Sequence, residues 1–478
     1  MAVFAFVVLG AAAVWLGGLN QDEGWYLYAA DLVAEGKMLY RDFFFTQGPA
    51  MPEAYRTWTW IWRNWGLLGA RIFTLALGFT GICFATGLAR RFAPEGRKGE
   101  AALIAFMLLG CNLYHLYYVA IPKTYALASM FVAMGFFALT AKRPIFKLLA
   151  GFFLAWAAGT RISLGALLCA VGLGLLVARQ WKVLLWFCVG GFGGLAINYG
   201  PFLCDAGARA GLIAAQQYHA ARGGFDLVWA VGSLSRLVRW YLPVFIVLGL
   251  GVAGTCRTSE TSRTKGTGVL LWGFVAVFVV QMLAPFPYED YQVPVMGLLA
   301  VYAAVKLVST AADGSRLPMM VILTLGLCFA NSFGSPLLEK WMTNGQDRFW
   351  SLKKEKCEMA QLRDVAKRIE AQDPGGKELF TQDTYLAIET RRKVPIEFAM
   401  GPYAVLSDDD LKRLVTETTM LIAALSGYSF APDMPSGRER SIEVQMECWT
   451  LLKKNYKLVD REEAFGQNAT TLLVLKRK

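Results

Sequence analysis

Two adjacent carboxylates, Asp22 and Glu23, follow the first apolar stretch of the chain, where a membrane helix would emerge. An ionised group at such a site is costly unless it is paired, hydrated or used in chemistry. A carboxylate there could act as a general base and take a proton from a hydroxyl group. The pair could instead cap the helix that follows, because Asp is a favourable N-cap residue.

Three more charged residues could share this chemistry. Asp42 belongs to the same polar segment and could supply a second carboxylate, or it could form a local ion pair with Arg41. Lys123 and Arg161 each lie in a short turn between apolar stretches. Such cations could bind a phosphate group, or they could simply reach lipid headgroups from a helix end.

Five side chains in longer polar segments are further candidates for binding a ligand: Tyr288, Glu289, Tyr291, His219 and Arg222. Glu289 could equally be a solvated loop charge, and His219 could be structural. The chain has only two histidines, and its nine cysteines show no C-x-x-C pair or zinc-ligand spacing. The sequence therefore predicts no cofactor and gives no support for a divalent metal.

The elements that must position these residues are apolar helices. The chain of 478 residues is 55% hydrophobic and only 18% charged, which is typical of a polytopic membrane protein. A span needs about 20 apolar residues, and this window predicts about eleven spans. They lie at 2–19, 67–89, 101–119, 124–141, 146–160, 164–179, 183–203, 240–255, 267–284, 292–308 and 318–334.

The segments between the spans predict the orientation. The short basic ones belong in the cytoplasm under the positive-inside rule, which also accounts for much of the net charge of +12 without a nucleic-acid partner. Three longer, aromatic segments then face outward: 20–66, 204–239 and 285–291. This alternation places the N-terminus inside and the C-terminus outside.

The expected fold is mainly α: a membrane helical bundle over 1–334, followed by a small soluble α/β domain over 335–478 on the outer face. The tail is charged, and segments typical of strands alternate there with segments typical of helices. It contains no G-x-G-x-x-G or P-loop sequence, so catalysis is expected in the membrane part.

The residues around the acidic pair carry a family resemblance. The pair is followed by an aromatic Y-x-x-A-A helix and by the sequences E-G-K-x-L-Y-R-D-F and Q-G-P. In this combination the chain resembles the GT-C superfamily of membrane glycosyltransferases, in its bacterial branch related to protein O-mannosyltransferases and the lipid A aminoarabinose transferase. The resemblance is densest over 20–90 and is looser at 120–131, 157–161 and 285–294.

This resemblance implies an inner-membrane enzyme that moves a sugar from a polyprenyl-phosphate-linked donor to a glycan, lipid or protein hydroxyl at the outer face. Asp22 would be the base, and Glu23 would orient it or the acceptor. Arg161 would bind the donor phosphate, and the five side chains of the longer polar segments would contact the donor sugar or its phosphate. Many relatives carry a second aspartate where this chain has Lys123. Either Asp42 replaces that acid, or Lys123 binds the donor phosphate.

Two other classes of function remain open at this point. A transporter or flippase of a lipid-linked sugar would share the apolar spans, although the chain shows no repeated half of the kind common in transporters. A non-catalytic membrane scaffold that presents the tail is the other alternative. Membrane lipids are expected partners in every case.

Overall fold

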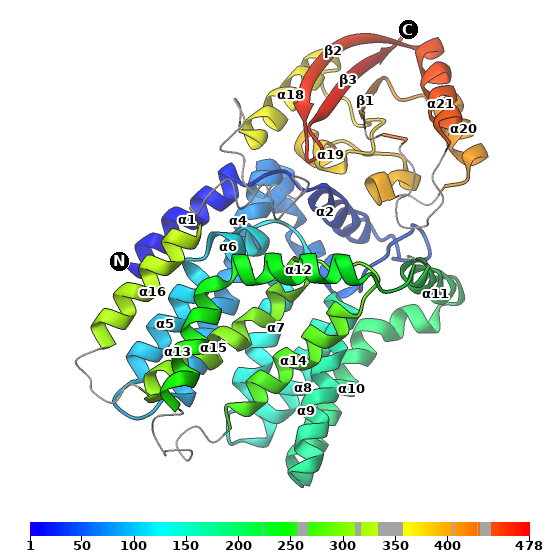
Figure 1. Ribbon diagram of the computed structural model, residues 1–478. Coiled ribbons are helices and arrows are strands. Elements are labelled where there is room, and N and C mark those ends of the chain that lie inside the picture. The colour runs from blue at the N-terminus through cyan, green and yellow to red at the C-terminus, as the bar shows by residue number, and fades with distance from the viewer. Residues whose placement is uncertain are drawn as a thin grey trace.

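An apolar helical bundle forms the N-terminal two-thirds of the protein, as a computed structural model shows (Figure 1). The structure describes residues 1–221, 223–255, 266–310, 317–332, 357–403, 406–427, 429–430 and 441–478. The helices of the bundle are α1 (Ala2–Leu16), α4 (Thr59–Phe92), α5 (Lys98–Gly110), α6 (Leu113–Ala120), α7 (Thr124–Leu139), α8 (Pro144–Thr160), α9 (Gly165–Val177), α10 (Trp181–Cys204), α13 (Leu242–Thr255), α14 (Gly268–Met282), α15 (Val293–Thr310) and α16 (Leu317–Ser332).

Every predicted span coincides with one or more of these helices. Within the part of the chain that the structure describes, three helical stretches are long and apolar enough to cross a membrane, and up to five if each bent pair is one span. The bent pairs are α5 with α6, at 68°, and α12 (Leu227–Trp240) with α13, at 78°. Asn112 explains the first bend, because its side chain caps α6 by accepting from the His115 backbone N–H. The total number of crossings stays a prediction.

Close helix packing in the bundle depends on small residues. The helices α8 and α10 approach so closely that a Cβ on Gly190 would lie 1.9 Å from the Leu148 carbonyl oxygen. A Cβ on Gly151 would likewise lie 2.0 Å from the Phe187 carbonyl oxygen. Small residues let backbones pack at such distances where lipid, rather than water, surrounds the helices.

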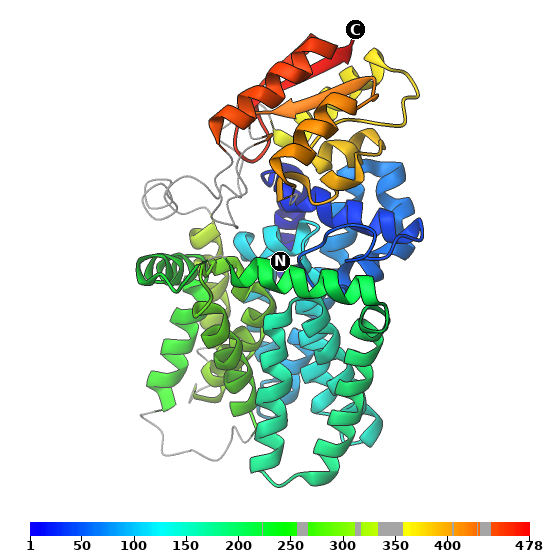
Figure 2. The ribbon, with the colours of Figure 1, turned by 90° about the vertical axis from the view of Figure 1, so that its right-hand side faces the viewer.

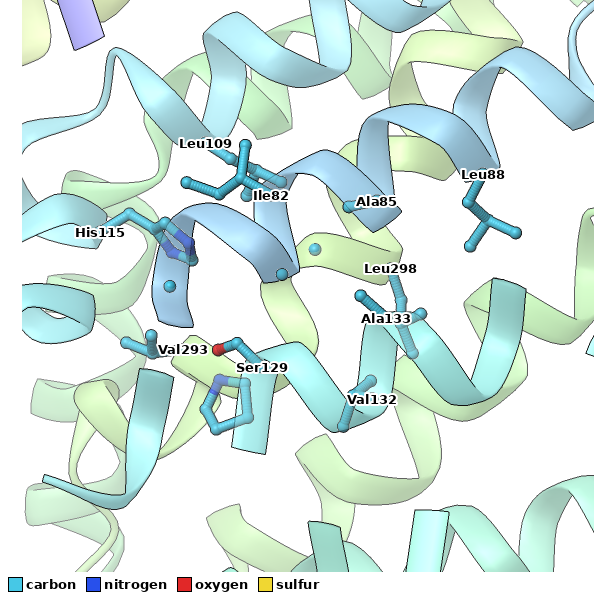
Figure 3. A pocket seen from close by; sticks show the side chains of 14 residues that line it. Ile82, Ala85, Leu88, Leu109, His115, Ser129, Val132, Ala133, Val293 and Leu298 are labelled. Atoms are coloured by element: carbon cyan, nitrogen blue, oxygen red, sulfur yellow. The ribbon is translucent and has the colours of Figure 1, made fainter. Parts of the chain in front are cut away.

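His115 is a packing residue of the bundle. Its Nδ1 lies 2.9 Å from the Tyr241 hydroxyl, and its ring borders a cavity of about 20 Å³ (Figure 3). The Ser129 hydroxyl faces the same cavity and has no hydrogen-bond partner among the described residues. A cavity of this size holds about one water molecule, which would satisfy such a group.

Shorter helices cover one end of the bundle, where the sequence predicted the outer face. They are α2 (Gln21–Ala34), α3 (Ala50–Tyr55), α11 (Ala206–Ala220) and α12, together with the short 3-10 helices η1 (Arg56–Trp58) and η3 (Glu289–Gln292). The helices α11 and α12 lie across the ends of the bundle helices (Figures 1 and 2). Helix α4 begins within the predicted outward segment and is broken at Gly66, whose φ of 63° suits glycine.

The tail forms a mixed layer of helices and strands beyond this end (Figure 2). Its elements are α18 (Glu358–Gln372), α19 (Thr384–Thr390), η5 (Ile396–Phe398), η6 (Gly401–Tyr403), α20 (Asp408–Glu417), β1 (Ile422–Ser426), α21 (Ile442–Asn455), β2 (Tyr456–Phe465) and β3 (Thr470–Arg477). The sheet is antiparallel in the order β1-β3-β2, with Ala424 opposite Val474 and Leu458 opposite Leu475. The predicted domain boundary near 335 lies outside the described residues.

The tail is anchored on the helices beneath it. Glu358 accepts a 2.6 Å hydrogen bond from the Leu19 backbone N–H, and Glu389 accepts one of 2.8 Å from the Leu67 N–H, just after the break at Gly66. Buried side chains of α2, α18, α19 and the sheet belong to one apolar core, separate from the core of the bundle. The helix that carries the acidic pair is therefore packed between the bundle and the tail.

Candidate active site

The acidic pair starts helix α2 through a capping box. The Asn20 side chain accepts a hydrogen bond from the Asp22 backbone N–H at 3.1 Å. Glu23 in turn accepts one from the Asn20 N–H at 2.9 Å. This exchange satisfies the free N–H groups at the start of the helix and fixes the first turn. Asp22 and Glu23 then point in different directions, because neighbours on a helix face do not share a side.

Asp22 faces a partly open polar cluster. One carboxylate oxygen accepts a 3.1 Å hydrogen bond from the Trp25 indole N–H, and the other lies 2.8 Å from the Lys123 ammonium. The side chain of Asp22 keeps 23% of its surface exposed, whereas that of Lys123 keeps 9%. Asp22 is thus a carboxylate that a substrate hydroxyl can reach.

Glu23 is buried completely and pairs with Arg71. The guanidinium group donates to both Glu23 oxygens, at 2.7 and 2.6 Å. It also donates to the carbonyl oxygens of Val14, Gly17 and Gly18 at the end of α1, at 2.8 to 3.0 Å. The expectation that Glu23 orients the acceptor is wrong, because neither oxygen is exposed and both are bound by Arg71. Glu23 joins α1, α2 and α4 instead.

Lys123 lies between two acids. Its ammonium is 2.8 Å from Asp22 and 3.7 Å from an oxygen of Asp290, which also accepts a 2.7 Å hydrogen bond from the Tyr125 hydroxyl. Burial alone would lower the pKa of Lys123, but the negative charges of Asp22, Tyr125 and Asp290 and the hydrogen bond to Asp22 together outweigh this effect and raise the pKa above its ordinary value. Lys123 is therefore a charged group held at the site.

Asp290 is the second carboxylate of the cluster, although the sequence pointed to its neighbour Glu289. The two acids are adjacent in one short segment, and the sequence alone does not show which of them faces the cluster. The expectation that Asp42 supplies the second carboxylate is wrong. Asp42 binds the Arg41 guanidinium at 2.9 and 3.1 Å and the Met38 N–H at 2.8 Å, and no contact among the described residues joins it to the cluster.

Arg161 lies beside the same cluster at the end of α8. Its guanidinium carbon is 4.9 Å from the ring centre of Tyr125 and 4.4 Å from that of Tyr291. One N–H lies 3.3 Å from the Thr124 hydroxyl, and the described residues provide no carboxylate for an ion pair. Stacking between aromatic rings orients the planar group while leaving other donors for a ligand. Tyr291 thus belongs to the cluster, through Arg161.

Glu289 and Tyr288 connect the cluster segment to α12. Glu289 is buried and accepts a 2.9 Å hydrogen bond from Arg236. Tyr288 packs with its ring 5.5 Å from Trp229, whose N–H donates to the Pro287 carbonyl at 3.1 Å. The expectation that Glu289 binds the donor is not supported by this position, because its charge is already paired and hardly exposed.

The candidates of the second outward segment lie elsewhere. His219 Nε2 is 2.7 Å from the Thr46 carbonyl oxygen and 3.5 Å from the Gln47 amide nitrogen, so it links α11 to the segment after Asp42. Arg222 lies outside the described residues. Within the described ranges, no group of three or more His, Cys, Asp or Glu residues is arranged to hold a metal ion.

The fold that carries this site is similar to the folds of solved proteins. No protein-family model and no curated protein matches the sequence. The structure is similar to ArnT from Cupriavidus metallidurans bound to undecaprenyl phosphate, with a TM-score of 0.62, 14% identity, and coverage of 99% of this chain and 97% of that one. It is also similar to the apo state of ArnT, with a TM-score of 0.60, 13% identity and the same coverage.

A weaker similarity, with a TM-score of 0.48, 11% identity and coverage of 89% of this chain and 69% of the other, relates it to the Archaeoglobus fulgidus oligosaccharyltransferase. The likeness to ArnT runs through the bundle and the tail alike, because nearly all of both chains is covered. The expected resemblance is therefore confirmed at the level of the fold, since the chain shares the fold of ArnT over nearly its whole length.

Proposed function

We propose that the protein transfers a sugar from a polyprenyl-phosphate-linked donor to a hydroxyl group of a glycan, lipid or protein at the outer face of the inner membrane. The observation that carries this proposal is the partly exposed Asp22 carboxylate, 2.8 Å from Lys123, with Arg161 beside the same cluster. The fold adds support, since ArnT, whose fold this chain shares, was solved with undecaprenyl phosphate bound.

Each part of the cluster has a role in the proposed reaction. Asp22 takes the proton of the acceptor hydroxyl as its oxygen attacks the anomeric carbon. The bond between that carbon and the phosphate oxygen breaks, and the electron pair leaves with the polyprenyl phosphate. Lys123 and Arg161 stabilise the negative charge that develops on the leaving phosphate.

The ion pair of Asp22 with Lys123 fits this sequence of events. The ammonium lies 2.8 Å from one carboxylate oxygen of Asp22 and occupies it. A donor phosphate that binds Lys123 competes with Asp22 for the same ammonium. Binding of the donor thus releases this oxygen of Asp22 for the acceptor hydroxyl.

The test is the variant Asp22→Asn in purified protein with labelled polyprenyl-phosphate sugar and a mixture of envelope acceptors. Loss of a general base costs about 10²- to 10⁴-fold in rate, so we expect at least a hundredfold loss. Asp42→Asn is the matched control: an acid of the same outward segment, bound to Arg41, whose loss leaves the rate within a few-fold. Equal activity of the two variants would refute the proposal.

The product separates the classes of function. A transferase releases polyprenyl phosphate, a flippase moves intact donor across a vesicle membrane, and a scaffold does neither. Because the proposal gives the leaving-group charge to Lys123 and Arg161, we expect transfer to continue in the presence of EDTA. Loss of transfer on chelation, restored by a divalent metal, would contradict that assignment.

A further inference from the structure

A second cavity, of about 720 Å³, lies at the end of the bundle opposite the candidate active site. It is bordered by the last turns of α4, α7 and α9 and the first turns of α8, α10 and α14. Apolar side chains form most of its wall: Phe136, Leu139, Val171, Leu175, Val269 and Trp272. Cavities that bind small molecules usually measure about 300–1,000 Å³, so a ligand of ordinary size fits.

Two cations border this cavity at its polar edge. The Arg91 guanidinium stacks 3.4 Å from the ring centre of Phe137 and donates through Nη1 to the Phe137 carbonyl at 2.8 Å. The Lys147 ammonium donates to the Leu139 carbonyl oxygen. Both cations thus gather at the C-terminal end of α7, where the helix dipole favours positive charge.

These cations lack an opposite charge in the part of the chain that the structure describes. Neither Arg91 nor Lys147 forms an ion pair there, and no Asp or Glu is among the residues that border the cavity. Their hydrogen bonds to other described residues use Nη1 of Arg91 and one donor of Lys147, so further N–H groups remain for a ligand. Among the described residues, the cavity therefore combines apolar walls with two positive charges that no carboxylate neutralises.

We propose that this cavity binds an anionic glycerophospholipid, with an acyl chain between α7, α9 and α14 and the phosphate at Arg91 and Lys147. The apolar walls demand an apolar chain, which a free phosphate lacks. Two cations favour a net negative headgroup over a zwitterionic one, whose own cation they would repel. The site is distinct from the candidate active site, so it does not depend on the proposed function.

Native mass spectrometry of the purified full chain tests this proposal, with phosphatidylglycerol and phosphatidylcholine of equal chain length as probes. We expect phosphatidylglycerol to bind at least fivefold more tightly. Arg91→Gln with Lys147→Gln should abolish this preference. The matched control, Lys142→Gln with Arg143→Gln, removes two exposed cations that do not border the cavity and should retain it.

A second pair of variants tests the apolar part. A side chain at Gly174 would enter open space at the cavity, because no atom lies within 4 Å of its Cβ position. Gly174→Phe should therefore reduce binding of phosphatidylglycerol without disturbing the fold. Gly172→Phe, on the same helix and equally unobstructed but outside the cavity, should bind like the wild type.

Three results would overturn the proposal. The first is equal binding of the two lipids by the wild type, or a preference that survives loss of both cavity cations. The second is equal binding of phosphatidylglycerol by Gly174→Phe and Gly172→Phe, which would show that the acyl chain does not lie in the cavity. The third is displacement of phosphatidylglycerol by millimolar inorganic phosphate, which would assign the cations to a free anion.

Discussion

At the residue scale, the structure separates two adjacent acids that look equivalent in sequence. Asp22 keeps 23% of its side-chain surface exposed beside Lys123, whereas Glu23 is fully buried against Arg71. Burying an ion pair is costly and is compensated only when the remaining donors and acceptors are satisfied. The bonds from Arg71 to the carbonyl groups of Val14, Gly17 and Gly18, at and just after the end of α1, provide that compensation.

Arg71→Met should therefore destabilise the protein strongly. It leaves the Glu23 charge buried without a partner, which costs about 3–5 kcal/mol. Arg63→Met on the same helix should cost about 0–1 kcal/mol, because Arg63 is 46% exposed in its ion pair with Asp31. Thermal unfolding in detergent compares the two variants. Adding Glu23→Gln should recover part of the loss at Arg71, and equal stability of the two single variants would contradict the assignment.

Asp383 in the tail predicts a dependence of stability on pH. Burial raises the pKa of Asp383 to about 6, from an ordinary value near 3.8. The unfolded chain releases this proton first, so the contribution of Asp383 to stability is present below about pH 4 and is lost as the pH rises to about 6. The shift corresponds to about 3 kcal/mol at most.

Asp383→Asn should remove that loss, because an amide stays neutral. Unfolding temperatures of wild type and variant, measured from pH 4 to 8, should diverge between about pH 4 and 6, with the variant more stable at the higher pH. Titration of all other groups cancels in this difference. Curves that stay parallel over the whole range would show that Asp383 is ionised in the folded protein.

At the scale of elements, α2 is held from two sides. A Cβ added to Gly24 would lie 2.0 Å from the Tyr385 backbone nitrogen and 2.5 Å from the Thr384 carbonyl carbon, so α2 and α19 touch through their backbones. Such a contact fixes the distance between the tail and the helix that carries Asp22. The tail thus supports the candidate site, and none of its described residues joins the Asp22 cluster.

Gly24→Ala should push α19 away from α2. Overpacking of this kind costs about 1–3 kcal/mol, and the displaced helix should reduce kcat several-fold through Asp22. Gly172→Ala, where a Cβ meets no atom within 4 Å, is the control and should leave the stability and kcat unchanged. Steady-state kinetics and unfolding temperatures check this together. A fully active and stable Gly24→Ala protein would show that the helices separate at no cost.

The sequence predicted helices better than it predicted contacts. Apolar windows identified the bundle helices because hydrophobic length is a local property that the membrane imposes. The choice of Glu289 over Asp290 depends on the direction in which a short 3-10 helix presents its side chains. For Asp42 the sequence left two alternatives open, and the structure shows the local one, since Arg41 and the Met38 N–H bind both of its oxygens. Such contacts are set by tertiary structure.

At the scale of the whole molecule, the protein has two apolar cores joined at the candidate site. One core fills the bundle, and the other includes α2 and the tail. Composition alone separates a membrane part of the chain from a soluble domain. It could not predict that the outward segment after Asp22 packs with the tail, because that core is assembled from residues more than 300 positions apart.

The predicted orientation of the whole molecule can be tested by cysteine labelling in intact cells. A cysteine at Lys377 in the tail should react with a membrane-impermeant maleimide applied to spheroplasts. A cysteine at Lys142, in a short basic turn, should react only after the membrane is permeabilised. Both positions belong to exposed charged residues, so access of the reagent reports the side. Equal labelling before permeabilisation would reject the predicted topology.

The contacts of Arg71 at the end of α1 also have a consequence for how the protein should be expressed. Its guanidinium group binds the carbonyl groups of Val14, Gly17 and Gly18, so replacing residues 1–18 with a secretion leader that is cleaved off would remove three of its acceptors and loosen the start of α2. Met1, in contrast, is 98% exposed. An affinity tag fused ahead of Met1 leaves the first helix intact, and purification schemes should keep that helix native.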